Sequence, residues 1–415
     1  MIVHSRVKPS MSEISSPPTP PKARRRWLQF SLRTLMVLML LFACGLGWLV
    51  HEIKQVRQRR EAAEVICELG GGMSHGWPRT VLAWVGTWLG EDLSDDVTHV
   101  ALYTRNTWDT EAAMQLLGRL TTLEELELHS TEVTDSQLKQ LRGLTRLTHL
   151  EINSPRVTDA GLEHLRGLTQ LQSLALPKST TDAGLEHIRG LTQLEYLRLE
   201  DAQITGAGLE RLRGLTRLRV LGLHGTPITD AGLAHVRHFS QLECLGLWGT
   251  KITGAGFAQL RGLTKLKRVE LRDAQVMDAG LEHLGALTQL EHLQLNGTRI
   301  TDAGLLHLQA LQQLDCLGLA NTAVTDAGLT HLRAMTHVQS LSLNDTQLTD
   351  AGLARLGRMP QLRQLWLSRT QVTDNGLPHL RGLTQLQDLE LKETPVTDEG
   401  VAKLQKALPN VKITR

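Results

Sequence analysis

Seven histidines recur at one position of the chain, each five residues after a slot that usually holds aspartate: His164, His187, His235, His283, His307, His331 and His379. Imidazole binds metal ions and titrates near neutral pH, so a metal-binding or pH-sensing ladder is one interpretation. The other is that GLxHL is only the helical part of a repeated unit. We favour the second, because no carboxylate or thiol joins the histidines in register, and we predict no metal.

Four cysteines, Cys44, Cys67, Cys244 and Cys316, are the only thiols. Cys244 and Cys316 fall in the same slot three repeats apart, about 14 Å, which is too far for a disulfide. No base converges on either thiol in the repeat pattern, so we predict free cysteines without a catalytic role. Leu41-Phe42-Ala43-Cys44 partly resembles a lipobox, although Phe42 departs from it, and lipidation of Cys44 remains an alternative.

A third group of side chains lies between recurring leucines, where a strand would point them outward. It includes the aromatic and arginine residues that commonly anchor protein interfaces. We predict partner contacts at Tyr196, Arg198, Val220, His224, Trp248, Arg268 and Arg272, with Trp366 as a second centre about 24 Å away. Glu200, Cys244 and Glu270 occupy similar positions. The alternative is that these aromatics are exposed without any function.

The chain carries no P-loop, G-x-S-x-G, HExxH or CxxC pattern, so we predict no catalytic residue, no cofactor and no small-molecule substrate. Its 45 basic and 43 acidic residues nearly cancel, which argues against nucleic acid as a partner. We therefore expect the partner to be a protein.

The element that must position these residues is a repeat of 24 residues, with one step of 23. Its aspartate slot is filled by Asp135, Asp159, Asp182, Gly206, Asp230, Gly254, Asp278, Asp302, Asp326, Asp350, Asp374 and Asp398. Each unit reads L-x-x-L-x-L-x-x-T-x-I-T-D-A-G-L, with strand spacing first and helical spacing after it. A single unit cannot close its own core. We therefore predict an α/β solenoid of about twelve units, with a parallel concave sheet and short outer helices.

Two polar positions of the unit have predicted structural roles. The Thr-Asp pair would offer its hydroxyl and carboxylate to free N–H groups at the helix start, with Gly206 and Gly254 as tolerated substitutes. A small hydroxyl three residues after the last strand leucine would satisfy backbone groups where the strand ends. It is present at Thr131, Ser179, Thr226, Thr250, Thr298, Thr322, Thr346, Thr370 and Thr394.

On these motifs the chain resembles the leucine-rich-repeat superfamily, specifically the TDAGL type found in F-box adaptors and many bacterial proteins. The resemblance covers roughly residues 97 to 413 and implies a protein-binding solenoid. No F-box precedes the repeats, so the ubiquitin-ligase role is not implied. The N-terminal FSLRTLMVLMLLFACGLGW, followed by REAAEVICELGG, resembles membrane-anchored repeat proteins of planctomycete bacteria, which implies an envelope protein.

Four segments are expected: a disordered basic and Pro-rich tail (1–33), a transmembrane helix (34–50), a juxtamembrane helix with an N-terminal cap (51–96), and the solenoid (97–415). Residues 34–50 contain no charge, and the preceding segment is long for a cleaved signal. The helix should continue beyond residue 50 and end at Gly70, Gly71 and Gly72. Trp84 and Trp88 would lie on one helical face, at the membrane interface or covering the first repeat, and we favour the latter.

The basic residues nearest the apolar segment are Lys22, Arg24, Arg25, Arg26 and Arg33 before it and Lys54, Arg57, Arg59 and Arg60 after it. Five against four specifies the orientation only weakly. We expect a single-pass membrane protein with a cytoplasmic N-terminus and extracytoplasmic repeats. The opposite orientation would suit a cytoplasmic adaptor that recruits substrates to a separate enzyme, and it remains the alternative.

Overall fold

The computed structural model describes residues 32–68, 71–75, 97–103, 107–129 and 132–415. The chain forms two units, Met1–Lys54 and Gln55–Arg415. Helix α1 (Leu32–Glu68) begins in the first unit and continues into the second. Its stretch Met36–Ala63 contains an 18-residue window with a mean hydropathy of 1.9, which is apolar enough to cross a membrane, and side chains such as Phe42 are exposed. Length and composition support a membrane span, and they would equally suit a signal sequence.

The C-terminal part of α1 belongs to the second unit. Val56, Ala63 and Ile66 are buried there, and the Arg59 guanidinium donates a hydrogen bond to Thr121 Oγ1 at 3.1 Å. The continuation of the helix beyond residue 50 is confirmed.

The segment that follows α1 contains a strand that the sequence did not predict. Gly71 and Gly72 lie in β1 (Gly71–His75), which pairs antiparallel with β2 (Val97–Leu102). The predicted Trp84 and Trp88 face falls outside the described residues, as does Gly70.

One sheet of fifteen strands runs through the second unit in chain order, and β2 to β15 are all parallel. The strands after β2 are β3 (Glu125–Leu128), β4 (His149–Ile152), β5 (Ser173–Ala175), β6 (Tyr196–Arg198), β7 (Val220–Gly222), β8 (Cys244–Gly246), β9 (Arg268–Glu270), β10 (His292–Gln294), β11 (Cys316–Gly318), β12 (Ser340–Ser342), β13 (Gln364–Trp366), β14 (Asp388–Glu390) and β15 (Lys412–Thr414). The twelve predicted units correspond to β3 to β14. Strands β2 and β15 were missed because neither is followed by a Thr-Asp pair.

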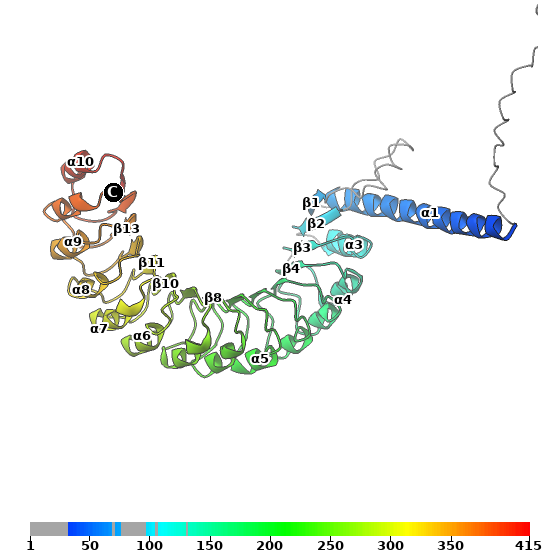
Figure 1. Ribbon diagram of the computed structural model, residues 1–415, viewed down its shortest axis with the longest axis horizontal. Coiled ribbons are helices and arrows are strands. Elements are labelled where there is room, and N and C mark those ends of the chain that lie inside the picture. Colours follow the sequence, from blue (N-terminus) through cyan, green and yellow to red (C-terminus); the bar gives the residue numbers. More distant parts are fainter. Residues whose placement is uncertain (1–31, 69–70, 76–96, 104–106, 130–131) are drawn as a thin grey trace, which may run out of the picture. The chain divides into compact units, whose positions relative to one another are not determined.

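Short helices return the chain from each strand to the next on the convex side, as Figure 1 shows for the part of the chain from β2 onward. The α-helices are α3 (Thr107–Leu117), α4 (Asp135–Leu138), α5 (Gly206–Arg211), α6 (Asp278–Leu284), α7 (Asp302–Leu305), α8 (Leu329–Leu332), α9 (Asp350–Leu356) and α10 (Asp398–Ala407). The 3₁₀ helices are η1 (Lys139–Gly143), η2 (Gly161–Leu165), η3 (Gly184–His187), η4 (Gly232–His238), η5 (Ala255–Gly262), η6 (Leu306–Ala310) and η7 (Leu377–Gly382). The predicted curved parallel sheet with short outer helices is confirmed.

The core consists of leucine columns that run from unit to unit. In the unit of β7, Leu221, Leu223, Leu233 and Val236 are all fully buried. Each unit buries its leucines only against the units before and after it, so the whole solenoid shares one continuous core.

The Thr-Asp pair acts differently from the prediction. The threonine does begin its own helix, since Thr301 Oγ1 accepts the N–H of Ala303 at 3.3 Å. The aspartate instead reaches the next unit: Asp302 accepts the backbone N–H of Thr325 at 2.8 Å and its hydroxyl at 2.6 Å. We call this series of contacts the Asp-Thr ladder. It joins the pairs Asp135–Thr158, Asp159–Thr181, Asp182–Thr205, Asp230–Thr253, Asp278–Thr301, Asp302–Thr325, Asp326–Thr349, Asp350–Thr373 and Asp374–Thr397.

The ladder is interrupted at Gly206 and Gly254, and these glycines are more than tolerated substitutes. Gly254 has a φ of 111°, a conformation that disfavours any side chain. A Cβ on Gly206 would lie 2.8 Å from the Cα of Gly232. A side chain at either glycine would therefore require the backbone of the next unit to shift.

The predicted role of the hydroxyl position is confirmed. Thr322 Oγ1, for example, donates to the carbonyl oxygen of Leu319 at 2.6 Å, and Thr370 Oγ1 donates to that of Leu367 at 2.7 Å. Ser179 donates instead to Val157 O, and Thr131 lies outside the described residues.

Candidate functional site

The concave face presents three rows of side chains. The first row contains the first residue of each strand, such as Tyr196 in β6 and Val220 in β7, which are neighbours in register. The second row contains the third residue, such as Arg198 and Gly222. The third row lies two residues further along each unit and includes His224 and Trp248. Because the period is constant, each row runs from unit to unit across the face.

A hollow of about 690 Å³ opens between the second and third rows in the middle of the sheet. Its lining residues are Glu200, Asp201, His224, Gly225, Trp248, Gly249, Glu270 and Arg272. Gly222 and Gly246 stand in the second row of β7 and β8, so two successive strands lack a side chain where β6 has Arg198 and β9 has Glu270. Neither glycine lines the hollow, because the His224 ring covers Gly246; the lining glycines are Gly225 and Gly249.

His224 and Trp248 form the wall of the hollow. A Cβ on Gly246 would lie 2.4 Å from the His224 ring, so the imidazole packs directly over that glycine. The Trp248 backbone N–H donates to His224 Nδ1 at 3.2 Å, which places the imidazole proton on Nε2, 3.7 Å from a Glu270 carboxylate oxygen. The indole N–H of Trp248 donates to Asp273 at 2.8 Å, and the two rings meet edge to face at 6.1 Å. Both rings are therefore held before any partner arrives.

Carboxylates outnumber cations in the hollow. Its lining contains Glu200, Asp201 and Glu270 against Arg272 alone. Lys178 pairs with Asp201 at 2.6 Å. Glu200 is exposed and has no ion-pair partner among the described residues. The arrangement favours a cationic group beside an aromatic surface.

The structure brings together three of the eight predicted contact residues, His224, Trp248 and Arg272, in the hollow. Arg198 pairs with Glu151 and borders a separate depression near β4 and β5. Tyr196, Val220 and Arg268 lie in the first row, on the same face but outside the lining. The sequence analysis missed Asp201, Gly225 and Gly249 as lining residues. The signal was present in the successive LGLHG and LGLWG segments, whose glycines remove side chains from the face.

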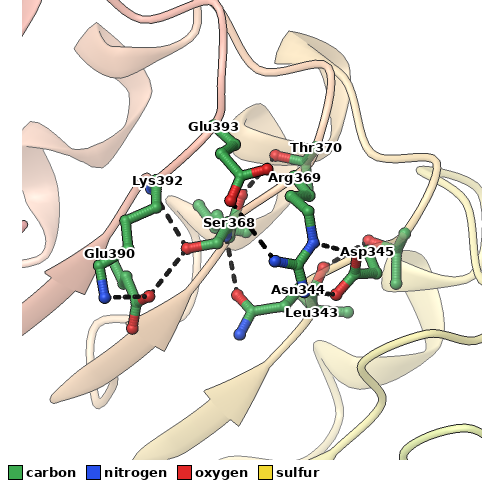
Figure 2. A network of polar contacts seen from close by, with 11 residues as sticks. Leu343, Asn344, Asp345, Ser368, Arg369, Thr370, Glu390, Lys392 and Glu393 are labelled. Atoms are coloured by element: carbon green, nitrogen blue, oxygen red, sulfur yellow. Dashed lines mark hydrogen bonds and ion pairs between the residues drawn. The ribbon is translucent and has the colours of Figure 1, made fainter. Parts of the chain in front are cut away.

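Trp366, the second predicted centre, is only partly exposed and lies in β13 opposite Glu390 of β14. Figure 2 shows the neighbouring polar groups engaged with one another: Ser368 Oγ donates to Glu390 at 3.1 Å, and Asn344 accepts the N–H of Ser368 at 2.7 Å. Arg369 lies between Asp345 and Glu393. Polar groups that already bind one another have less to offer a partner than those of the hollow.

The recurring histidines do not form a ladder of imidazoles. Instead, residues of the preceding unit contact them: Arg166 with His187 at 2.8 Å, Arg261 with His283 at 3.1 Å, and Gln309 with His331 at 3.0 Å. One expectation was wrong. A carboxylate does join the series, because Glu210 Oε2 lies 2.6 Å from His235 Nδ1.

Cys244 and Cys316 occupy the first row with Arg268 and His292 between them, which confirms their predicted common slot. Both are free thiols, and burial raises the pKa of Cys244 to about 11. Cys44 is exposed on α1.

Comparison with known proteins identifies the repeats. A family model described as a leucine-rich repeat region matches residues 174–412, more than half of the chain. An internalin of Listeria monocytogenes superposes with a TM-score of 0.57 at 22% identity, covering 81% of this chain and 94% of its own. A leucine-rich-repeat protein of Leptospira interrogans gives a TM-score of 0.48 at 18% identity, covering 72% and 92%. No curated protein is significantly similar in sequence. The internalin supports the fold of the repeats alone.

Proposed function

This chain belongs to the leucine-rich-repeat family, whose members are typically non-enzymatic binding scaffolds, and from that premise we propose that it is a membrane-anchored scaffold that binds a protein on its concave face. The observation that carries the proposal is the hollow lined by His224, Trp248 and Glu270. Other depressions on the face, such as the two bordered by Glu151 and Arg198, are smaller.

We place the binding centre at Trp248. Its side chain is 49% exposed although the ring is held by Asp273 and packed against His224. A fixed, exposed indole loses little conformational entropy when a partner covers it, which is why tryptophan so often dominates interfaces. Tyr196, 40% exposed in the first row, extends the surface toward β6, and Arg198, Val220, Arg268 and Arg272 border it.

The partner should insert a lysine or arginine side chain into the hollow. Glu200 offers a carboxylate without an ion-pair partner among the described residues, and Glu270 offers a second carboxylate. Trp248 adds an aromatic face for a cation. An acidic side chain would meet these carboxylates without sufficient compensation, because Arg272 is the only lining cation.

Helix α1 supplies the anchor in this proposal. Its candidate span Met36–Ala63 begins with fifteen residues without a charge and contains an 18-residue window apolar enough to cross a bilayer, while the turns from Val56 onward pack within the second unit. The basic N-terminal flank favours repeats outside the cytoplasm, and the resemblance to TDAGL-type and planctomycete proteins points to a bacterial envelope.

Photocrosslinking in native membranes tests the binding face. A benzoylphenylalanine placed at Trp248 should give a specific crosslinked protein, whereas one placed at Leu306, exposed on the convex side at the start of η6, should not. Glu200→Gln should lower the yield from position 248, and the crosslinked peptide should contain lysine or arginine. Equal yields from both positions would refute a concave binding centre.

Protease treatment of spheroplasts carrying a C-terminal tag tests the orientation. Loss of the tag, with cytoplasmic proteins intact, would support extracytoplasmic repeats. Full protection would contradict this orientation and favour the cytoplasmic adaptor that recruits substrates to a separate enzyme.

A further inference from the structure

The convex side holds one cluster of metal-ligating groups that stands apart from the binding face. Glu210 of α5 and His235 and His238 of η4 each offer one ligand atom, and the three atoms lie within 4.8 Å of one another. His235 Nδ1 is 2.6 Å and His238 Nε2 is 4.0 Å from the same oxygen, Glu210 Oε2. All three side chains are partly exposed, so an ion can reach them from solvent.

Two local features bring the imidazoles to this oxygen. In a 3₁₀ helix, residues three apart point the same way, so His235 and His238 project from one side of η4. The Asp-Thr ladder is interrupted next to them at Gly206, where the Cα of Gly232 comes close. The position that a Cβ would take on Gly206 is 3.4 Å from the His235 ring.

We propose that Glu210, His235 and His238 form a binding site for a divalent transition metal ion of the zinc class. Two imidazole nitrogens and one carboxylate oxygen are a ligand set that zinc accepts, with water in the fourth position. Ligand atoms about 3.2 to 3.5 Å apart surround a tetrahedral zinc ion, given bond lengths of about 2.0 to 2.2 Å. The 2.6 Å contact must therefore lengthen slightly and the 4.0 Å contact must shorten, which partly exposed side chains can do.

The other carboxylate oxygen of Glu210 is already held. Arg213 donates to Oε1 at 3.2 Å, which leaves Oε2 facing the two imidazoles. An outer hydrogen bond of this kind orients a ligating carboxylate. The hydrogen bond from His235 lowers the pKa of Glu210, and a metal ion at this position would replace the Nδ1 proton that makes the bond.

The other recurring histidines lack this arrangement. His187 and His283 are each contacted by an arginine, Arg166 and Arg261, and a guanidinium beside the imidazole opposes a cation. His283 is thus a matched control, since it fills the same slot two units away without a carboxylate partner.

The test uses the full chain in detergent, without a histidine tag and after treatment with a chelator. Cobalt(II) should produce the visible absorption of a tetrahedral ion, and zinc should displace it. His238→Ala and Glu210→Gln should weaken cobalt binding at least tenfold, whereas His283→Ala should bind like the unaltered chain. Circular dichroism checks that each variant is folded.

A thermal measurement gives an independent readout. Zinc should raise the unfolding temperature of the unaltered chain and of His283→Ala but not of His238→Ala, because a ligand that binds only the folded state stabilises it. Absence of cobalt absorption in the unaltered chain, or equal binding by all variants, would overturn the proposal. Neither result bears on the concave binding face.

Discussion

At the residue scale, nine successive units leave the sheet through one residue with a positive φ. The angle lies between 53° and 70° at Asp201, Gly225, Gly249, Asp273, Gly297, Asn321, Asp345, Arg369 and Glu393. Only three of these are glycine, so the remaining six carry a conformational cost that is greatest for long side chains and least for asparagine and aspartate. These residues adopt the strained conformation because the chain must turn sharply after the last buried leucine of each strand segment.

Glu393→Gly should stabilise the protein by about 0.5 to 1 kcal/mol, because glycine adopts this φ without steric cost and the exposed ion pair with Arg369 contributes little. Asn321→Gly is the matched control and should gain less. Urea unfolding of the full chain in detergent measures both. A destabilised Glu393→Gly protein would contradict this account of the turn.

Cys244 should resist alkylation at neutral pH. Burial, together with nearby Glu270, raises the pKa of its thiol to about 11, so the nucleophilic thiolate is scarce until the solution becomes strongly alkaline. Peptide-resolved mass spectrometry after iodoacetamide treatment should show little modification at pH 7.5 and a steep rise above pH 10. Rapid labelling at neutral pH would mean that the chain around β8 opens locally.

At the element scale, the Asp-Thr ladder links the helical segment of a unit to the next unit wherever the slot holds an aspartate. Asp302 satisfies two donors of Thr325, whose own hydroxyl accepts the N–H of Ala327. The same pair of residue types thus starts a helix and connects two repeats.

Asp302→Ala should destabilise the protein by about 1 to 3 kcal/mol, since it leaves the N–H of Thr325 without its acceptor. Asp398→Ala is the control at the same slot: its carboxylate pairs with Arg415 rather than with a threonine, and its side chain is 95% exposed. It should cost less than about 0.5 kcal/mol. Equal losses would show that the aspartate acts within its own helix.

The ladder also predicts loss of stability in acid. Burial alone would raise the pKa of Asp230, but hydrogen bonds from Thr253, Gly256 and Gly254 outweigh it and hold the pKa below its usual range. A lowered folded-state pKa contributes stability above the unfolded value of about 3.9, and that stability disappears as the pH falls through the folded value. Asp230→Asn should therefore lose less stability between about pH 5 and pH 3 than the unaltered chain in urea titrations.

At the scale of the whole molecule, the solenoid is a chain of nearest-neighbour contacts. No unit contributes side chains to a centre shared by all, and the leucine columns continue through every interface. Stability should therefore be close to a sum over units and interfaces.

Deletion of residues 302–325 removes one complete period and joins Thr301 to Asp326, which preserves both the Thr-Asp pair and the leucine register. The shortened protein should fold, and its unfolding free energy should depend less steeply on urea concentration than that of the unaltered chain, because unfolding exposes less surface. Deletion of residues 302–313 removes half a period and should abolish cooperative unfolding. Strand β10 lies between the deletion and the last lining residues of the hollow, Glu270 and Arg272, so crosslinking from position 248 should survive the first deletion.

The sequence determined the solenoid, the concave strand positions and the hydroxyl that closes each turn. It did so because a constant period and fully buried leucines such as Leu221 and Leu223 allow only stacked units. Helix α1 was also predictable from its uncharged segment, although the strand β1 after it was not, because its glycine-rich sequence has little preference for a strand.

Only the tertiary structure decided which side chains of different units meet. Asp302 reaches Thr325 rather than its own helix, Glu210 approaches His235, and residues from the units of β6 to β9 line one hollow. These contacts depend on the offset and rotation between adjacent units and on side-chain direction. A pattern within one unit specifies which residues face inward, but the distance between residues of two units exists only after the units have stacked.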